Sequence, residues 1–91
     1  MEELNIYWDV SGWAIFDMMD RKAHEIACRY LKECLTANSS INFFRPLKDQ
    51  EEYHIYPLAT EVWFNKMEVH TRMLVWEEVI AIATFLFIKR K

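Results

Sequence analysis

The most informative hydrophobic pattern in this 91-residue chain runs from Leu58 to Ile88. At about 100° per residue, its large apolar side chains fall on two neighbouring stripes of a helix. The first stripe holds Leu58, Val62, Val69, Met73, Trp76, Ile80 and Phe87, and the second holds Trp63, Met67, Leu74, Ala81 and Phe85. Residues 79–88 are apolar on all sides except at Thr84, so they must be buried by the rest of the chain, by a second copy, by a partner or by lipid.

A single helix over residues 58–88 would be longer than most helices in globular proteins, so a break near residues 65–72 is expected. A second interpretation stays open for the same segment. In it, residues 60–64 and 67–71 form a hairpin about Asn65 and Lys66, and residues 79–88 form a buried strand. The fold prediction below uses the helical interpretation.

The first half of the chain predicts a strand followed by an amphipathic helix. Apolar and polar residues alternate over Glu3–Val10, which favours a strand. The helix is expected from Trp13 to Ala37, because charges of alternating sign recur at every fourth position and stabilise a helix. These charges are Asp17, Arg21, Glu25, Arg29 and Glu33, and the opposite face holds Phe16, Met19, Ala23, Ile26, Ala27, Tyr30 and Cys34.

Two short aromatic segments, Ile41–Arg45 and Glu52–Tyr56, predict a hairpin whose turn contains Pro46. Pro57 is expected to close the second strand and to enter the first turn of the last helix. The predicted fold is therefore a small two-layer α+β domain in the order β-α-β-β-α. Its short antiparallel sheet would be covered by the amphipathic helix and by a long apolar C-terminal helix.

Composition indicates one domain over residues 1–91 and excludes several functions. The net charge is −3 and the charges are mixed along the chain, so no basic surface for nucleic acid is present. Gly12 is the only glycine, which excludes the glycine-rich loops that bind phosphate groups, and no cofactor is expected. Apolar residues make up 53% of the chain, which is high for a domain with so thin a core.

Few residues are spaced as in metal-binding or catalytic sites. His24 and Cys28 are four positions apart, like half of a metal site that His54 and His70 would have to complete, and we expect no metal. Asp17, Asp20 and His24 lie on adjoining helical turns, but helix stabilisation already explains both carboxylates, so no catalytic residue is expected. Cys34 is expected in the core, too far along the same helix to form a disulfide with Cys28.

The sequence therefore predicts a non-enzymatic protein-binding module, an inhibitor that occupies the surface of another protein. Phage-encoded inhibitors of host or defence machinery and immunity proteins for toxins are of this size and composition. The expected contact residues are large and apolar, as in most binding hot spots. They are Tyr7, Trp63, Trp76, Phe85 and Phe87.

Two alternatives stay open. One is a self-associating structural homodimer in which residues 79–88 of two copies pack together. The other is a peripheral membrane protein that uses residues 73–91, where an apolar run precedes three basic residues. Membrane contact is nevertheless not expected, because the run is too short to span a bilayer and contains Glu77 and Glu78. The acidic N-terminus does not resemble a signal peptide, and reduced cysteines favour a cytoplasmic setting.

Overall fold

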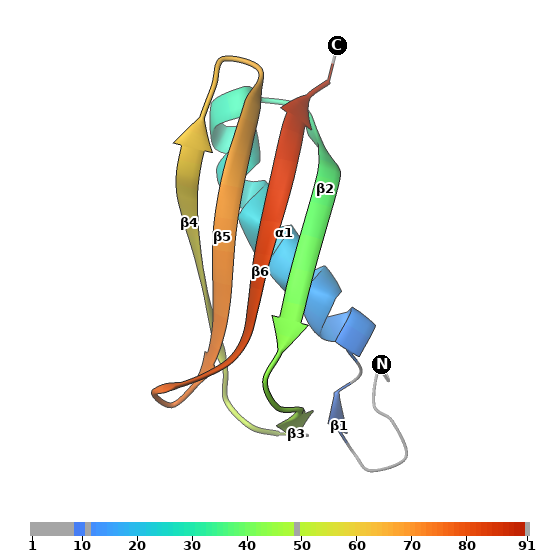
Figure 1. The fold of residues 1–91 in the computed structure, drawn as a ribbon, viewed down its shortest axis with the longest axis vertical. Helices are drawn as coiled ribbons and strands as arrows, with labels where there is room; N and C mark the ends of the chain where they lie inside the picture. Colours follow the sequence, from blue (N-terminus) through green and yellow to red (C-terminus); the bar gives the residue numbers. More distant parts are fainter. Residues whose placement is uncertain (1–8, 11, 49, 91) are drawn as a thin grey trace.

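The structure is a computed structural model that describes residues 9–10, 12–48 and 50–90. It consists of one long helix on one face of a four-stranded antiparallel sheet, with a small two-stranded sheet at one end (Figure 1). The helix is α1 (Gly12–Leu31). The large sheet contains β2 (Cys34–Phe43), β4 (His54–Val62), β5 (Lys66–Val75) and β6 (Glu78–Lys89), and the small one contains β1 (Asp9–Val10) and β3 (Leu47–Lys48).

The strand order of the large sheet is β2-β6-β5-β4, so β2 and β4 are its edges. Two hairpins, β4–β5 and β5–β6, build three neighbouring strands, and β2 then pairs with the far side of β6. Its register pairs Cys34 with Lys89 and Phe43 with Ala81. This pairing brings the strand that follows the helix beside the end of the chain.

The core lies between α1 and the face of the sheet that the helix covers. Alternate residues of β5 point to this side, namely Met67, Val69, Thr71, Met73 and Val75. On the helix, Ala23 and Ala27 are completely buried, and their small side chains allow the helix to pack closely on the central strands. Phe16 and His24 contact the rings of Phe85 and Phe87, at centroid distances of 5.5 and 5.6 Å.

The predicted C-terminal helix over residues 58–88 is wrong, because this segment forms β4, β5 and β6. The hairpin interpretation is confirmed, since the β4–β5 turn lies between Val62 and Lys66 and residues 78–89 form a strand. From Lys66 to Arg72, polar residues alternate with buried ones along β5, which is a period of two rather than 3.6. In the apolar run of β6, Ala81, Ala83, Phe85 and Phe87 are buried on the helix side, whereas the alternate residues Ile82, Leu86 and Ile88 lie on the outer face and are exposed or partly buried.

Pro57 does not begin a helix, and the predicted hairpin between Ile41–Arg45 and Glu52–Tyr56 is also wrong. Pro57 lies inside β4, where an edge position tolerates its missing N–H group. The two predicted hairpin strands belong to opposite edges of the sheet, in β2 and β4. Of the predicted strand Glu3–Val10, residues 3–8 lie outside the described part of the chain, and Asp9–Val10 is a strand.

The helix ends at Leu31, six residues before its predicted end at Ala37. Lys32 adopts a left-handed φ of 71°, and its backbone N–H donates to the carbonyl oxygen of Cys28 at 2.9 Å. This is the usual way to end a helix, although glycine is the residue that favours it. The chain then reverses, so Cys34 is the first residue of β2 and no longer part of the helix. None of the helices in the described ranges is long and apolar enough to cross a membrane.

Candidate functional site

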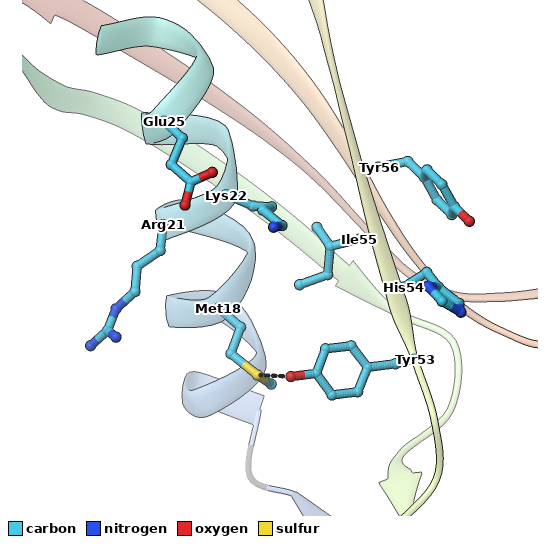
Figure 2. Close-up of a pocket in the computed structure, with 8 residues that line it drawn as sticks. All are labelled: Met18, Arg21, Lys22, Glu25, Tyr53, His54, Ile55 and Tyr56. Carbon is cyan, nitrogen blue, oxygen red and sulfur yellow. Dashed lines mark hydrogen bonds between the residues drawn. The ribbon is translucent and has the colours of Figure 1, made fainter. Parts of the chain in front are cut away.

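One groove lies between the helix and the edge strand β4 (Figure 2). Its lining includes Met18, Arg21, Lys22 and Glu25 from α1, and Tyr53 to Tyr56 from the other side. The Tyr53 hydroxyl donates to the Met18 sulfur at 3.2 Å, while His54 and Tyr56 point away from the helix (Figure 2). The groove has a mixed polar lining but no pairing of a nucleophile with a base, so it offers no evident chemistry.

The opposite side of the helix faces β2 and carries the carboxylate of Asp20. The Thr36 hydroxyl donates to Oδ1 of Asp20 at 2.9 Å, which holds the carboxylate against the edge strand. Asp20 is half-buried and forms no ion pair with any residue of the described ranges, whereas Asp17 pairs with Arg21 at 3.0 Å. Asp20 therefore keeps a free carboxylate oxygen for another hydrogen-bond donor.

One turn further along the helix, His24, Cys28 and Cys34 form a cluster. Their ligand atoms all lie within 4.8 Å of one another. The Cys28 and Cys34 sulfurs are 3.1 Å apart, and Cys28 Sγ lies 3.5 Å from each nitrogen of the His24 ring. The sequence prediction that both cysteines share one helix was wrong, because the early end of α1 turns Cys34 back onto Cys28.

The surroundings of Cys34 disfavour its thiolate. Burial raises the pKa of the Cys34 thiol from 9.0 to about 12, and the hydrogen bond with Cys28 and the nearby negative charges act in the same direction. Cys34 is therefore a neutral thiol at physiological pH in the protein as described. It is not an activated nucleophile, because that role requires a lowered pKa or a positioned base.

The two edges of the large sheet differ in how they are protected. Edge strands usually carry charges or proline that prevent pairing with another chain. Strand β4 has Pro57 and Glu61, whereas β2 reads CLTANSSINF and contains neither a charged residue nor proline. Residues 35–40 of β2 are all exposed. Among the strands that the structure describes, β2 is therefore an open edge able to accept another strand, and Asp20 lies beside it.

The contact residues predicted from sequence do not form one surface. Trp63 and Trp76 lie in the β4–β5 and β5–β6 turns and are 39% and 85% exposed, and the Lys66 amine lies over the Trp63 ring. Phe85 and Phe87 are completely buried in the core and present nothing to a partner. Tyr7 lies outside the described residues.

Of the four residues considered for a metal site from sequence, His24 and Cys28 lie together in the structure. His54 and His70 lie on β4 and β5 and are not part of this cluster. Asp17, Asp20 and His24 share the helix, but no hydrogen bond joins them among the contacts of the described residues. Thr36 was missed, because the prediction placed it inside the helix. Only the correct helix end would have brought it beside Asp20.

No protein-family model and no curated protein matches this sequence. Solved structures do match over nearly the whole chain. A hexameric thioesterase from Yersinia pestis matches with a TM-score of 0.89 at 14% identity, covering 97% of this chain and 78% of that one. A hexameric broad-specificity acyl-coenzyme A thioesterase gives 0.86 at 18% identity, covering 98% and 72%. A Thermus thermophilus thioesterase, complexed with coenzyme A and Zn, gives 0.85 at 10%, covering 98% and 72%.

These likenesses correct the functional prediction. The chain superimposes on enzymes, so the expectation of a non-enzymatic inhibitor is overturned, together with its alternatives of a structural homodimer and a peripheral membrane protein. At these low identities the matches establish the fold, and the activity is considered separately below. The chain has the α+β hotdog fold, in which a four-stranded antiparallel sheet wraps around one N-terminal helix.

Proposed function

We propose that this protein is a hydrolase of acyl thioesters, with coenzyme A thioesters as its substrate class. The observation that carries the proposal is the match of almost the whole chain to several thioesterases at TM-scores of 0.85 to 0.89. The similar structures include two variants in which an aspartate is replaced by alanine. An aspartate is therefore the first residue type to test for a catalytic role.

Asp20 is the carboxylate best suited to this reaction. It lies on the central helix, has no cationic partner among the described residues, and is held by Thr36 with one oxygen left free. A carboxylate in this state can act as a general base that takes a proton from the water attacking the thioester carbonyl. It can also attack the carbonyl itself and form a transient anhydride. In both routes the coenzyme A thiol leaves and one water is consumed.

A second copy of the chain would complete the site. Asp20 lies beside the edge strand β2, where one protomer alone leaves the reacting carboxylate only partly covered. Pairing of β2 with the β2 strand of another copy would continue the sheet and cover this edge. Two of the similar thioesterases are hexamers, which is consistent with self-association of this fold.

The test is hydrolysis of acyl-coenzyme A substrates of short, medium and long chain length by the purified full-length protein. Loss of the thioester absorbance should be followed directly, because a thiol reagent would also react with Cys28 and Cys34. We expect turnover of at least one chain length well above the spontaneous rate. Hydrolysis no faster than the buffer control across the whole panel, with folded and self-associated protein, would reject the proposal.

A further inference from the structure

We propose that His24, Cys28 and Cys34 form a binding site for a zinc ion that joins the C-terminal part of α1 to the start of β2. The inference does not depend on thioester hydrolysis, because none of these three residues has a role in the reaction proposed above. It rests on the donor set, on the hydrogen bond of the imidazole ring and on access from solvent.

The fold brings the three donors together from two elements. His24 and Cys28 are one helical turn apart, and the reversal after Lys32 returns Cys34 to the same place. Two cysteine thiolates and one imidazole are ligands that zinc prefers, and three protein ligands with one open position are common at zinc sites. Zinc binding displaces the proton of each thiol to solvent, so that Cys34, which is neutral in the metal-free protein, binds the ion as a thiolate. Magnesium and calcium require oxygen ligands, so the thiol pair selects against them.

The His24 ring has the hydrogen bond expected of a metal ligand. Its Nε2 lies 3.1 Å from the backbone carbonyl oxygen of Cys34. In the tautomer with a proton on Nε2, this nitrogen donates to the carbonyl, and Nδ1 is the unprotonated nitrogen, 3.5 Å from Cys28 Sγ. Zinc-bound histidines usually donate their second nitrogen to a backbone carbonyl or carboxylate in this manner, which fixes the ring and its tautomer.

The distances require only a small adjustment. At a tetrahedral zinc ion, a sulfur and a nitrogen ligand are roughly 3.6 Å apart and two sulfurs roughly 3.8 Å apart. The separation of Cys28 Sγ and His24 Nδ1 is 3.5 Å, close to this value. The two sulfurs are 3.1 Å apart, so they must separate by roughly 0.7 Å, which a small rotation of either side chain achieves. The His24 ring must also turn so that Nδ1 points at the ion.

An ion can reach the cluster from solvent. The three side chains line a surface hollow of about 340 Å³ together with Lys32, Glu33 and Arg90. Cys28 and His24 are half-buried, so the open side of the cluster faces this hollow. The fourth zinc position would therefore be filled by water from the hollow.

The experiment is a zinc titration of the full-length protein, fully reduced and freed of metal, followed by competition with a chromophoric chelator. We expect one zinc per chain and a rise in melting temperature on binding, because the ion binds the folded state. Replacing zinc with cobalt should give the absorbance of cobalt–thiolate bonds. The variants Cys28→Ser and His24→Gln should each weaken zinc affinity by roughly 100-fold or more. His70 is an exposed histidine outside the cluster, so His70→Gln is the matched control and should bind zinc like the unmodified chain.

Three results would overturn the proposal. They are no zinc uptake by the reduced chain, an unchanged affinity for zinc in both cluster variants, and a cobalt complex without thiolate absorbance. A mass lower by two hydrogens after exposure to air, combined with no zinc uptake by the reduced chain, would identify the two cysteines as a disulfide pair instead. Each readout is independent of hydrolysis, so failure here and failure of the proposed enzyme activity are distinguishable.

Discussion

The hydroxyl group of Thr36 donates a hydrogen bond of 2.9 Å to the carboxylate of Asp20, and this bond links the edge strand β2 to the central helix. It fixes one carboxylate oxygen while the other stays free. Among the described residues, no cation competes for the carboxylate. Thr36 therefore acts as a positioning residue for the proposed catalytic group.

Removing this hydrogen bond should slow hydrolysis without weakening substrate binding to the same extent. Thr36→Val keeps the shape of the side chain but lets the carboxylate rotate, and we expect kcat to fall about 10-fold with little change in KM. Thr36→Ser retains the hydroxyl and should restore kcat. Steady-state kinetics of both variants checks this, and equal losses in both would point to a merely structural role.

Self-association through β2 should be sensitive to a charge on that strand. Ser39→Lys places an amine near the middle of the exposed edge, so that two lysines meet when two β2 strands pair. We expect its dimer dissociation constant to rise at least about 10-fold, as measured by sedimentation. Leu58→Lys is the control, because Leu58 is exposed on the opposite edge strand β4. An unmodified chain that stays monomeric at all concentrations would contradict this interface.

Thr71 should limit the stability of the fold. Its hydroxyl is buried on β5 facing the helix, with no hydrogen-bond partner among the described residues. Thr71→Val removes this unsatisfied group with little change in shape, so we expect the free energy of unfolding to rise by about 1 kcal/mol. Thr60→Val is the matched control. The Thr60 hydroxyl donates to Glu68, so urea unfolding should show no gain for that variant.

Cys34 should make the fold sensitive to alkali. Its pKa is about 12 in the folded protein and near 9.0 without burial, so the folded state keeps the proton over a range in which the unfolded state loses it. The free energy of unfolding is therefore unaffected by this group below pH 9 and should fall as the pH rises from 9 towards 12.

Urea unfolding with reductant and chelator, at about pH 8 and about pH 10.5, checks this effect. The loss between the two pH values should be smaller in Cys34→Ala, although that variant is less stable at both. An equal loss in the two proteins would show that Cys34 does not account for the effect.

The helix could be predicted from sequence because its signal is local. Charges of alternating sign at every fourth position predicted it, and apolar residues of the opposite face, such as Met19, Ala23 and Ala27, are buried against the sheet. Its end could not be predicted, because Lys32 rather than glycine adopts the left-handed conformation there. Because the predicted helix was six residues too long, neither the contact between Cys28 and Cys34 nor the hydrogen bond between Thr36 and Asp20 could be predicted.

The last third of the chain was mispredicted because its apolar residues fit both the spacing of a helix and the alternation of a strand. The buried residues of β5 alternate with polar ones, from Lys66 to Arg72, which is the signal of a strand. The run in β6 hides this alternation, because the residues of its outer face, such as Ile82 and Ile88, are apolar although they are exposed. The β5–β6 turn also lacks the usual signal, since Trp76 occupies a φ of 59° where glycine or asparagine is typical.

The most direct test of the account compares the variants Asp20→Asn and Asp17→Asn in acyl-coenzyme A hydrolysis. Both replace an aspartate of α1 by its neutral isostere, but only Asp20 lies beside β2 with Thr36, whereas Asp17 pairs with Arg21 on the surface. We expect kcat/KM to fall by roughly 100-fold or more in Asp20→Asn and to stay within about twofold in Asp17→Asn. An Asp20→Asn variant that remains folded, self-associates and hydrolyses substrate at the unmodified rate would contradict the central claim.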